Sequence, residues 1–452
     1  MSLRANAVIL AAGKGTRMKS RTPKVLNELC GRTLFEHVLL AVTEAGIEPS
    51  DIVAVINPDL EKPLEQFNIR TVVQEPQNGT GHAAQLAMEE IPGDNPILFV
   101  NADMPLLMPN VVAAVVHTRE RTRAALAMLT TQMANSNFGR IVRNAGRPVR
   151  IVEHTDATPQ ELLITEVNAG VYCFEAEALR RYLSRLDTRN AQRELYLTDC
   201  IELAVKSGEL VEAVVVKDFR SALGINTNAE LAIARRVMQR RILRAHMLAG
   251  VRIVDPATTY VDADVDLAAD VTLLPQTHVL KGSTIAAGSV IGPTTTLERA
   301  SIGRDVTISY SVVRDSTVAD GASVGPFAHI RGSSEIGEHT RIGNFVETKN
   351  TRLGKGAKSN HLAYLGDAEV GEAANIGAGT ITCNYDGVRK HNTKIGARAF
   401  VGSNSSLVAP VEIGEGALTG AGSVVIRDVP AGERVAGNPA RPLPKKEDVK
   451  KP

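Results

Sequence analysis

The chain has 452 residues, of which 44% are hydrophobic and 22% charged, so we expect two or more globular domains rather than a single core. Its 51 basic and 50 acidic residues leave a formal net charge of +1, which gives no support for a nucleic-acid or membrane-surface partner. No apolar run approaches the roughly 18 residues that span a bilayer. The short apolar run near the start is predicted to be a first strand, not a signal peptide.

The cysteines favour a protein with reduced thiols. The four of them are far apart and form no C-x-x-C pair: Cys30, Cys173, Cys200 and Cys383. Zinc sites and disulfide frameworks need cysteines at closer, repeated spacings. We therefore predict neither, and a cytoplasmic location.

The first half predicts an α/β domain. Short β-branched runs are expected to be strands, at residues 7–11, 51–56, 70–73, 96–100, 125–130, 167–174 and 210–216. Apolar residues at helical spacing lie between several of them, at residues 34–45, 81–90 and 111–121. This alternation is typical of a Rossmann-like, mostly parallel sheet that binds ligands beyond the carboxyl ends of its strands. We assign residues 1–226 to this domain.

A long helix is predicted at residues 229–248, within a linker at residues 227–250. It carries arginines on several faces: Arg235, Arg236, Arg240, Arg241 and Arg244. A solvated connecting helix is the simpler explanation, and a nucleic-acid contact is the alternative that the overall charge does not support.

After residue 250 the sequence repeats every six positions. Aliphatic residues keep this phase at Ile285, Ile291, Leu297, Val324, Ile330, Ile336, Ile342, Ile395, Val401, Leu407 and Ile413. A period of six is typical of a left-handed parallel β-helix, in which each coil stacks on the next. We assign residues 251–452 to this domain, with a mobile tail at residues 445–452. The phase fails at residues 354–369 and 378–394, which we expect to be loops that leave the coils and carry function.

The run LAAGKGTRM at residues 10–18 directly follows the first predicted strand. Gly13 and Gly15 let backbone amides approach a polyanion, and Arg17 adds positive charge. The run is neither a Walker A loop nor a dinucleotide fingerprint, because the spacing and the third glycine are wrong. A purely structural turn is the alternative, but the nearby Lys24 favours phosphate binding.

This stretch, together with PKVL at residues 23–26, resembles the sugar-1-phosphate nucleotidyltransferases. The resemblance implies that Lys24 neutralises the attacked phosphate and Arg17 the departing pyrophosphate. It implies that Asp103 and Asn226 bind Mg²⁺, although a turn or helix-cap role is the alternative for Asp103. It implies that Gln74, Gly79 and Thr80 recognise the uracil ring and that Gly139, Glu153 and Asn168 hold the sugar. It also assigns Leu10, Ala11, Ala12 and Gly13 to the bound nucleotide. Such residue types suit the reaction, because two anions must meet and cations offset their repulsion.

One position departs from that family. Ala102, between Asn101 and Asp103, stands where the family usually has glycine. We expect the Cβ of Ala102 to lie close to the nucleotide, with the ligand role of Asp103 kept.

Three runs in the second half carry a further resemblance: GNFVETK at residues 343–349, HLAYLGD at 361–367 and NIGAGTITCNYDG at 375–387. With the first half, and over nearly the whole chain, they closely resemble the bacterial bifunctional N-acetylglucosamine-1-phosphate uridylyltransferase/glucosamine-1-phosphate N-acetyltransferase family. That implies acetyl transfer from acetyl-coenzyme A to glucosamine 1-phosphate, then transfer of UMP from UTP to N-acetylglucosamine 1-phosphate with release of pyrophosphate. The product, UDP-N-acetylglucosamine, serves peptidoglycan and lipopolysaccharide synthesis. The family also implies a homotrimer with acetyltransferase sites shared between subunits.

His361 matches the general base of that family, because the attacking amine must lose a proton and imidazole titrates near neutral pH. We expect Glu347 to orient this imidazole. The resemblance assigns the sugar phosphate to Arg331, Lys349, Tyr364 and Asn375. It assigns acetyl-coenzyme A to Ala378, Asn384, Tyr385, Ser403 and Ala421.

Near the end, VAGNPAR at residues 435–441 stands where the family often has an arginine that contacts coenzyme A, so we expect altered contacts there. Two alternatives remain open. A nucleotidyltransferase with a structural or allosteric β-helix would not need His361 or Lys349, and a non-enzymatic module would not need Lys24 or Asp103.

Overall fold

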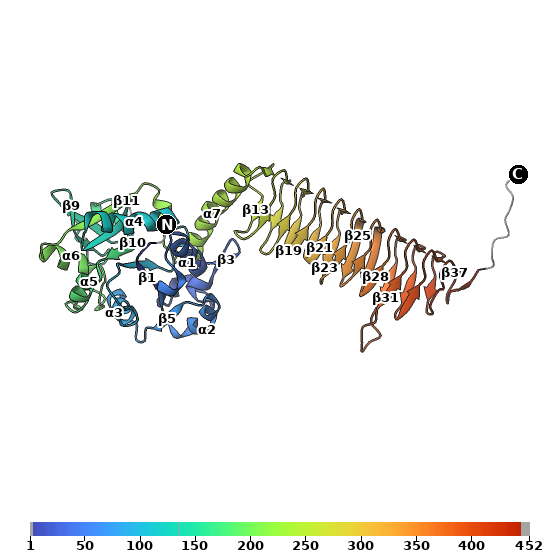
Figure 1. Ribbon diagram of the computed structural model, residues 1–452, viewed down its shortest axis with the longest axis horizontal. Coiled ribbons are helices and arrows are strands. Elements are labelled where there is room, and N and C mark those ends of the chain that lie inside the picture. Colours follow the sequence, from blue (N-terminus) through green and yellow to red (C-terminus); the bar gives the residue numbers. More distant parts are fainter. Residues whose placement is uncertain (1–2, 135, 444–452) are drawn as a thin grey trace. The chain divides into compact units, whose positions relative to one another are not determined.

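A computed structural model describes residues 3–134 and 136–443 of the chain. The tail at residues 445–452, predicted to be mobile, lies outside the described residues. The chain divides into two compact units, residues 1–238 and 239–452 (Figure 1). None of the helices in the described part of the chain combines the length and apolarity that a membrane crossing requires.

The first unit is built on a nine-stranded sheet whose main path is β11-β7-β10-β6-β1-β4-β5. The strands of this path are β1 (Asn6–Leu10), β4 (Ile52–Ile56), β5 (Arg70–Val73), β6 (Ile97–Asn101), β7 (Leu126–Gln132), β10 (Glu166–Phe174) and β11 (Val211–Val216). β1 is parallel to β4 and β6, and β7 to β11, whereas β10 runs antiparallel to β6 and β7. The predicted strands and the mostly parallel sheet are thus confirmed.

Helices cover both faces of this sheet. The helices are α1 (Leu34–Glu44), α2 (Glu61–Leu64), α3 (Thr80–Glu90), α4 (Pro109–Thr122), α5 (Ala176–Leu183) and α6 (Asp199–Lys206). The side chains of β1 alternate between two cores. Ala7 and Ile9 pack with residues of α1 and α4, whereas Val8 packs with residues of α3, α5 and α6. The carboxyl ends of β1 and β6 therefore lie at an edge of the sheet, between the helices that cover its two faces.

The sequence analysis missed several short elements. These are α2, α5, α6 and the hairpins β2 (Glu28–Leu29) to β3 (Arg32–Thr33) and β8 (Arg140–Asn144) to β9 (Arg147–Val152). The β8–β9 hairpin is rich in arginine and partly exposed, so it lacks the apolar alternation that identifies a half-buried strand.

Helix α7 (Asn228–Leu248) confirms the predicted long helix, but it is more than a solvated connector. Leu231 and Ala234 are buried, and Leu243 belongs to the core of the second unit. The side chain of Gln239 donates to Val261 O at 2.8 Å and accepts from Val261 N at 3.1 Å. The boundary between the two units falls within α7.

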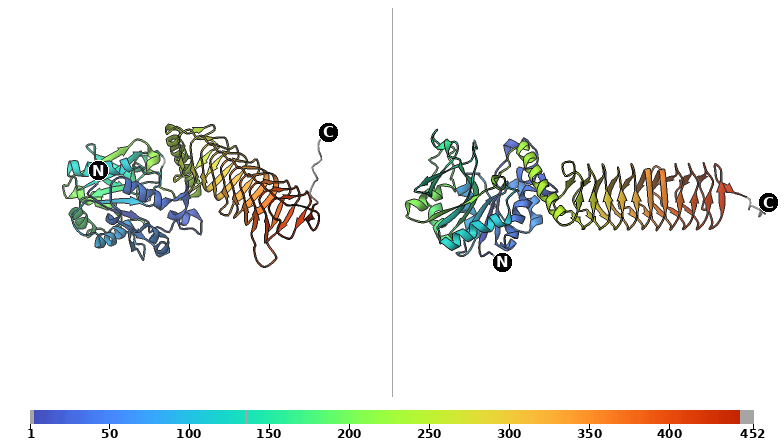
Figure 2. Two further views of the ribbon diagram at one scale, coloured as in Figure 1. Left: turned by 45° about the vertical axis from the view of Figure 1, so that its right-hand side comes forward. Right: turned by 90° about the horizontal axis from the view of Figure 1, so that it is seen from above.

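The second unit is a parallel β-helix of strands β12 (Arg252–Ile253) to β37 (Arg434–Ala436) (Figure 2). The last strand, β38 (Arg441–Pro442), pairs antiparallel with β37. The longest strands are β19 (Thr296–Ile302), β21 (Val312–Val318), β25 (Arg341–Lys349) and β27 (Lys358–Gly366), and the others have two or three residues. Partners in successive coils stack aliphatic side chains inside the prism, as in Ile291, Ile308, Val324 and Ile342. Every aliphatic residue that carried the six-residue phase is buried, so the hexapeptide prediction is confirmed.

Of the two loops predicted to leave the coils, the first, at residues 354–369, is not present. Residues 354–369 contain β27, which pairs with β25 over most of its length. The six-residue phase fails there because partners in neighbouring coils, such as Asn344 and His361, are separated by 17 residues rather than 18. The second break does contain a loop. Ala368 pairs with Thr393, a separation of 25 residues, and residues 384–392 project from the prism. We call residues 384–392 the arm.

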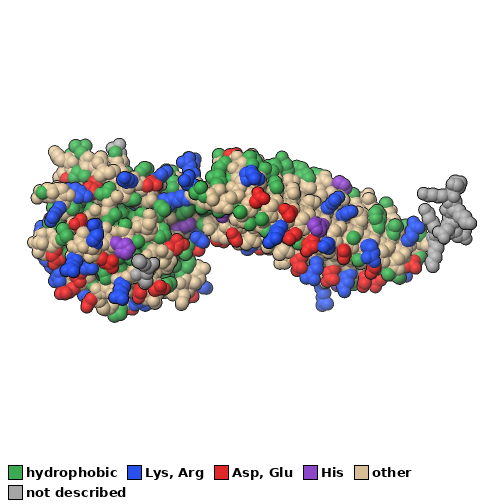
Figure 3. Space-filling model, turned by 45° about the horizontal axis from the view of Figure 1, so that its top comes forward, with side chains coloured by type: hydrophobic (Ala, Val, Ile, Leu, Met, Phe, Trp, Pro, Cys, Tyr) green, Lys and Arg blue, Asp and Glu red, His purple; other side chains and the backbone are tan. Residues whose placement is uncertain are grey.

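Charged side chains of both signs are interspersed over the face seen in Figure 3, without a large patch of one sign. This distribution agrees with a formal net charge of +1.

Candidate active sites

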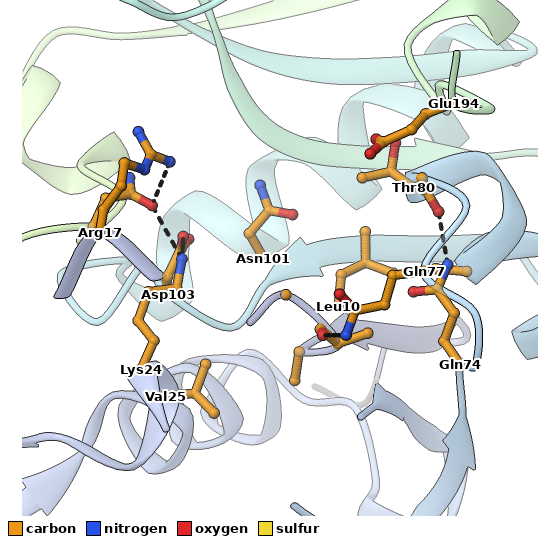
Figure 4. A pocket seen from close by; sticks show the side chains of 16 residues that line it. Leu10, Arg17, Lys24, Val25, Gln74, Gln77, Thr80, Asn101, Asp103 and Glu194 are labelled. Atoms are coloured by element: carbon orange, nitrogen blue, oxygen red, sulfur yellow. Dashed lines mark hydrogen bonds and ion pairs between the residues drawn. The ribbon is translucent and has the colours of Figure 1, made fainter. Parts of the chain in front are cut away.

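A cavity of about 350 Å³ opens beyond the carboxyl ends of β1 and β6 (Figure 4). Its lining includes Leu10, Ala11, Ala12, Gly13, Arg17, Lys24, Gln74, Gly79, Thr80, Asp103 and Asn226. Figure 4 shows Arg17, Lys24 and Asp103 toward one end of this cavity and Gln74 and Thr80 toward the other. Every residue that the sequence analysis assigned to the nucleotide or to Mg²⁺ therefore lines one cavity.

A second cavity of about 210 Å³ adjoins the first. Gly139, Glu153 and Asn168, the residues assigned to the sugar, all line it. The two cavities share five residues: Leu10, Thr80, Asn101, Asp103 and Asn226. Asp103 and Asn226 thus lie at the junction of the two cavities.

Four polar side chains meet at this junction. Lys24 Nζ lies 2.5 Å from Asp103 Oδ2 and 3.2 Å from Asn226 Oδ1. Arg17 Nη2 also donates to Asn226 Oδ1, at 2.9 Å. The two oxygens that could hold a metal therefore converge on one point, which a cationic group now occupies. Among residues 3–134 and 136–443 no group of three His, Cys, Asp or Glu side chains could hold a metal. A carboxylate and an amide oxygen that leave further positions to substrate phosphates nevertheless fit Mg²⁺.

Gly15 makes room for Lys24. Its φ of +61° is left-handed, and a Cβ there would lie 2.4 Å from Lys24 Cβ. Any larger residue would push Lys24 away from the junction.

The far end of the nucleotide cavity is fixed by hydrogen bonds of the buried Gln74 and the exposed Thr80. Gln74 is 4% exposed, and its Nε2 donates to Gly79 O at 2.9 Å. Thr80 Oγ1 accepts from Leu197 N at 3.0 Å at the start of α3. These bonds fix both side chains at this end of the cavity.

In the sugar cavity, Glu153 follows the β8–β9 hairpin and accepts a hydrogen bond from Thr198 Oγ1 at 3.3 Å. Burial raises the pKa of the Glu153 carboxyl, so its charge has a strong need for donors. Sugar hydroxyls are such donors. Asn168 Nδ2 donates to Tyr172 OH at 2.6 Å, and Asn168 Oδ1 accepts from Gly170 N at 3.0 Å.

The expectation for Ala102 is wrong. Ala102 is 1% exposed, packs in the core beneath α1 and α4, and lines neither cavity. Its N–H donates to Leu10 O at 3.0 Å, which continues the pairing of β1 with β6. Alternation along the strand turns its Cβ away from the ligand side, while Asn101 and Asp103 face the cavities.

In the β-helix, three of the four residues assigned to the sugar phosphate, Arg331, Lys349 and Tyr364, gather at one corner. Arg331, on β23 (His329–Arg331), pairs with Lys349 in the neighbouring strand β25. A Cβ at Gly366 would lie 2.4 Å from Tyr364 OH and 2.8 Å from Asn384 Nδ2, so the bare glycine lets both side chains approach it. Asn375, on β29 (Asn375–Ile376), is instead the partner of Lys358, at the opposite end of β27 from Gly366, so the structure does not bring it to this corner.

His361 lies at a different corner of the prism. It pairs with Asn344, and its Nδ1 lies 2.7 Å from Asn344 Oδ1. The next coils place Ala378, Ser403 and Ala421 at the same corner, because Gly379 N donates to Leu362 O, Asn404 N to Ala378 O and Gly422 N to Ser403 O. His361 therefore heads a column of residues assigned to acetyl-coenzyme A.

The expectation for Glu347 is wrong. Glu347 Oε1 accepts from Arg331 Nε at 2.8 Å and Nη2 at 2.5 Å, and its register partner is Tyr364 rather than His361. The 17-residue coil aligns Asn344 with His361 instead. Asn344 is the residue that the sequence analysis missed, and the offset within the coil was the signal that could have found it.

The arm is a small hairpin at the corner of Lys349. Its ends are joined by His391 N, which donates to Asn384 O at 2.8 Å, and Tyr385 forms a bridge with Lys390. Contact with the like charge of Lys390 lowers the pKa of the Lys349 ammonium group. With Arg331, this corner presents three cations, which suits a phosphate.

Comparison with known proteins agrees with both sites. Residues 7–198 match the model of the MobA-like NTP transferase domain, and residues 315–350 and 392–427 match the bacterial transferase hexapeptide (six repeats). The bifunctional protein GlmU of Corynebacterium jeikeium is 44% identical over 95% of this chain and 90% of its own. That of Halalkalibacterium halodurans is 45% identical over 94% of both chains.

The chain belongs to the bifunctional GlmU family. It is a glucosamine-1-phosphate N-acetyltransferase and an N-acetylglucosamine-1-phosphate uridylyltransferase. The nucleotidyltransferase match covers the strands around the two joined cavities, and the hexapeptide matches cover coils of the β-helix on either side of His361.

The sequence analysis missed other residues that line the two cavities of this chain. Gln77, Asn101 and Glu194 line the nucleotide cavity, and Tyr172 and Thr198 line the sugar cavity. Gln77 Nε2 donates to Ala12 O at 2.5 Å and so fixes the glycine-rich loop. Glu194 and Thr198 come from an irregular segment before α6, where no periodic pattern marked them.

Proposed function

We propose that the joined cavities of the first unit carry out uridylyl transfer with Mg²⁺ held by Asp103 and Asn226, and that His361 is the base for acetyl transfer. The observation that carries the first assignment is the shared lining: Asp103 and Asn226 belong to both cavities. The side-chain oxygens of Asp103 and Asn226 would hold the metal at that junction.

In uridylyl transfer, a phosphate oxygen of N-acetylglucosamine 1-phosphate attacks the α-phosphate of UTP and pyrophosphate leaves. Mg²⁺ supplies charge neutralisation for both reacting groups when it is bound. Lys24 stabilises the negative charge on the attacked phosphate, and Arg17 stabilises the departing pyrophosphate. Gln74, Gly79 and Thr80 orient the uracil ring, so binding at the far end aligns the phosphates at the junction.

The sugar is held by the second cavity. Gly139 leaves space beside Glu153, because a Cβ at this position would lie 3.3 Å from Glu153 Oε2 and 2.7 Å from Ile151 Cγ2. The Glu153 carboxylate accepts hydrogen bonds from the hydroxyl groups of the sugar, and the amide of Asn168 bonds to its polar groups, including the acetamido group.

In acetyl transfer, the amine of glucosamine 1-phosphate attacks the thioester of acetyl-coenzyme A. Asn344 Oδ1 only accepts hydrogen bonds, so the proton of the imidazole lies on Nδ1 and the lone pair on Nε2. His361 Nε2 then accepts a proton of the amine, the C–S bond of the thioester breaks, and coenzyme A leaves as a thiolate that takes up a proton. Arg331 and Lys349 bind the phosphate, with Tyr364 and Asn375 on the sugar, and Ala378, Asn384, Tyr385, Ser403 and Ala421 bind the coenzyme.

We propose that the protein acts as a cytoplasmic homotrimer. His361 and the cationic group around Lys349 lie at different corners of one prism, so a second copy that supplies the missing corner would complete the site. Exposed aromatic side chains on the β-helix support self-association: Phe327 and Phe345 stack with ring centroids 5.5 Å apart and are more than half exposed. Light scattering coupled to size exclusion would measure the mass, and a monomer with full acetyltransferase activity would contradict the shared site.

The decisive experiment supplies acetyl-coenzyme A, UTP, Mg²⁺ and glucosamine 1-phosphate together. Mass spectrometry should show UDP-N-acetylglucosamine, with glucose 1-phosphate as the control acceptor that yields no acetylated product. Failure to form N-acetylglucosamine 1-phosphate would contradict the acetyltransferase assignment, and its accumulation without the UDP-sugar would contradict the uridylyltransferase assignment.

A further inference from the structure

Asp367 lies at the base of the arm and has no role in the chemistry described above. It sits at a corner between β27 and β28 (Ala368–Val370), with a left-handed φ of +47°. It is only 8% exposed, which is unusual for a carboxylate on the surface of a β-helix. A buried charge of this kind must be compensated by hydrogen-bond donors.

The donors come from both sides of the corner. Asp367 Oδ2 accepts from Asn384 Nδ2 at 2.5 Å, and Oδ1 accepts from Asn350 Nδ2 at 2.8 Å. Its backbone N donates to Lys349 O at 2.9 Å. Its backbone O accepts from Thr393 N at 3.1 Å.

Two of these four bonds, from Asn384 and from Thr393, join Asp367 to the two ends of the arm, and the other two anchor Asp367 in the prism. Asn384 is the first residue of the arm, and Thr393 follows its last residue. The arm's own bonds, such as His391 N to Asn384 O and Tyr385 OH to Gly387 O, fix its internal shape but do not attach it to the coils. Tyr385 is 62% exposed and Val388 84% exposed, so burial of the arm contributes little to its position.

We propose that Asp367 is a positioning residue that clamps the arm, and thereby sets the affinity of the acetyltransferase site for acetyl-coenzyme A. The inference deepens the proposed function and rests on it, because Asn384 and Tyr385 are the arm residues assigned to the coenzyme. Asn384 donates one amide hydrogen to Asp367, which fixes the direction in which the rest of that amide faces the ligand.

The hydrogen-bond pattern allows a rescue experiment. In Asp367→Asn, one carboxylate oxygen becomes an NH₂ group, which opposes the NH₂ of Asn350 or of Asn384. Adding Asn350→Asp supplies an acceptor for that new donor, while the remaining oxygen at position 367 still accepts from Asn384. Asn350→Asp alone brings two carboxylates together and should loosen the same corner.

Two measurements are made on the full-length protein. One is the KM and kcat of acetyl transfer, and the other is the rate at which trypsin cleaves after Arg389 and Lys390, both exposed in the arm. We expect Asp367→Asn to raise the KM for acetyl-coenzyme A about tenfold with less than about a twofold change in kcat, and to speed arm cleavage. The double variant should restore both. Asp305→Asn, at another left-handed coil corner, is the matched control and should change neither.

Unchanged KM, or faster arm cleavage without any change in KM, would overturn the role of Asp367. A double variant that stays as impaired as Asp367→Asn would do the same. If Asp367→Asn fails to fold, judged by its thermal transition, Asn350→Asp replaces it with the same expectations. A wild-type protein without acetyl transfer would instead overturn the proposed function, so the two failures are distinguishable.

Discussion

The ammonium group of Lys24 lies between two oxygens, 2.5 Å from Asp103 Oδ2 and 3.2 Å from Asn226 Oδ1. Lys24 thus occupies the point on which the two proposed metal ligands converge. The side chains of Lys24 and Asp103 are only 12% and 18% exposed, so water screens this pair weakly. A divalent cation that binds here must displace Lys24, which is then free to turn toward a phosphate.

This relationship predicts the effect of Lys24→Met on metal binding. Loss of the ammonium group removes a competitor for Asp103, so Mn²⁺ should bind the nucleotide-free protein about tenfold more tightly, which corresponds to about 1.4 kcal/mol. Uridylyl transfer should nevertheless fall by about 100-fold or more, because the attacked phosphate loses its cation. Electron paramagnetic resonance of free Mn²⁺ measures the binding. Asn226→Ala is the control that should weaken it, and weaker binding in Lys24→Met would contradict the competition.

The two reactions should be separable by single substitutions. His361→Ala removes the proposed base and should lower acetyl transfer by about 100-fold or more, with uridylyl transfer unchanged. Asp103→Asn removes the charged metal ligand and should have the reverse effect. Separate steady-state assays of each half-reaction check this prediction. One substitution that silenced both reactions would show that the two sites are not independent.

Asn344 and Glu347 should differ in their effects on acetyl transfer. Asn344→Ala removes the acceptor that fixes the tautomer of His361, so kcat should fall about tenfold while the KM for glucosamine 1-phosphate changes little. Glu347→Gln loosens Arg331 and should mainly change that KM. Steady-state kinetics of the two variants, measured in parallel, test this difference. A larger loss of kcat in Glu347→Gln than in Asn344→Ala would show that Glu347 orients the imidazole.

The stability of the first unit should depend on pH through Asp199. Burial, with the charges of Asp187, Glu202 and Asp156, raises the pKa of Asp199 to about 6, from an ordinary value near 4. The folded state therefore holds this proton more tightly than the unfolded state. Its stabilising contribution is fully present below about pH 4 and is lost as the pH rises through about 6.

Asp199→Asn carries no charge at any pH, so its melting temperature relative to the wild type should rise between pH 4.5 and pH 7. Calorimetry at a series of pH values measures this difference, with Asp59→Asn on the exposed surface as the control. A difference that stays constant across this range would contradict the raised pKa.

The outline of both units was predictable because it depends on short-range periodicity. The apolar residues of strands such as β4 and helices such as α1 recur at the spacing of their own element and are buried. The hexapeptide phase from Ile285 to Ile413 repeats because each coil must place an aliphatic side chain in the core. Elements with mixed polarity, such as the β8–β9 hairpin, were missed because tertiary contacts hold them.

The amino-acid sequence by itself determined which residue types stand beside the glycine-rich loop and in the coils, and the residues assigned to the nucleotidyltransferase site do line its two cavities. Only the tertiary structure decided how they face one another. A 17-residue coil places His361 beside Asn344 instead of Glu347. Strand alternation turns the side chain of Ala102 into the core. The corner at Asp367 is bonded to both ends of the arm. These relations depend on register and side-chain direction, which spacing along the chain does not specify.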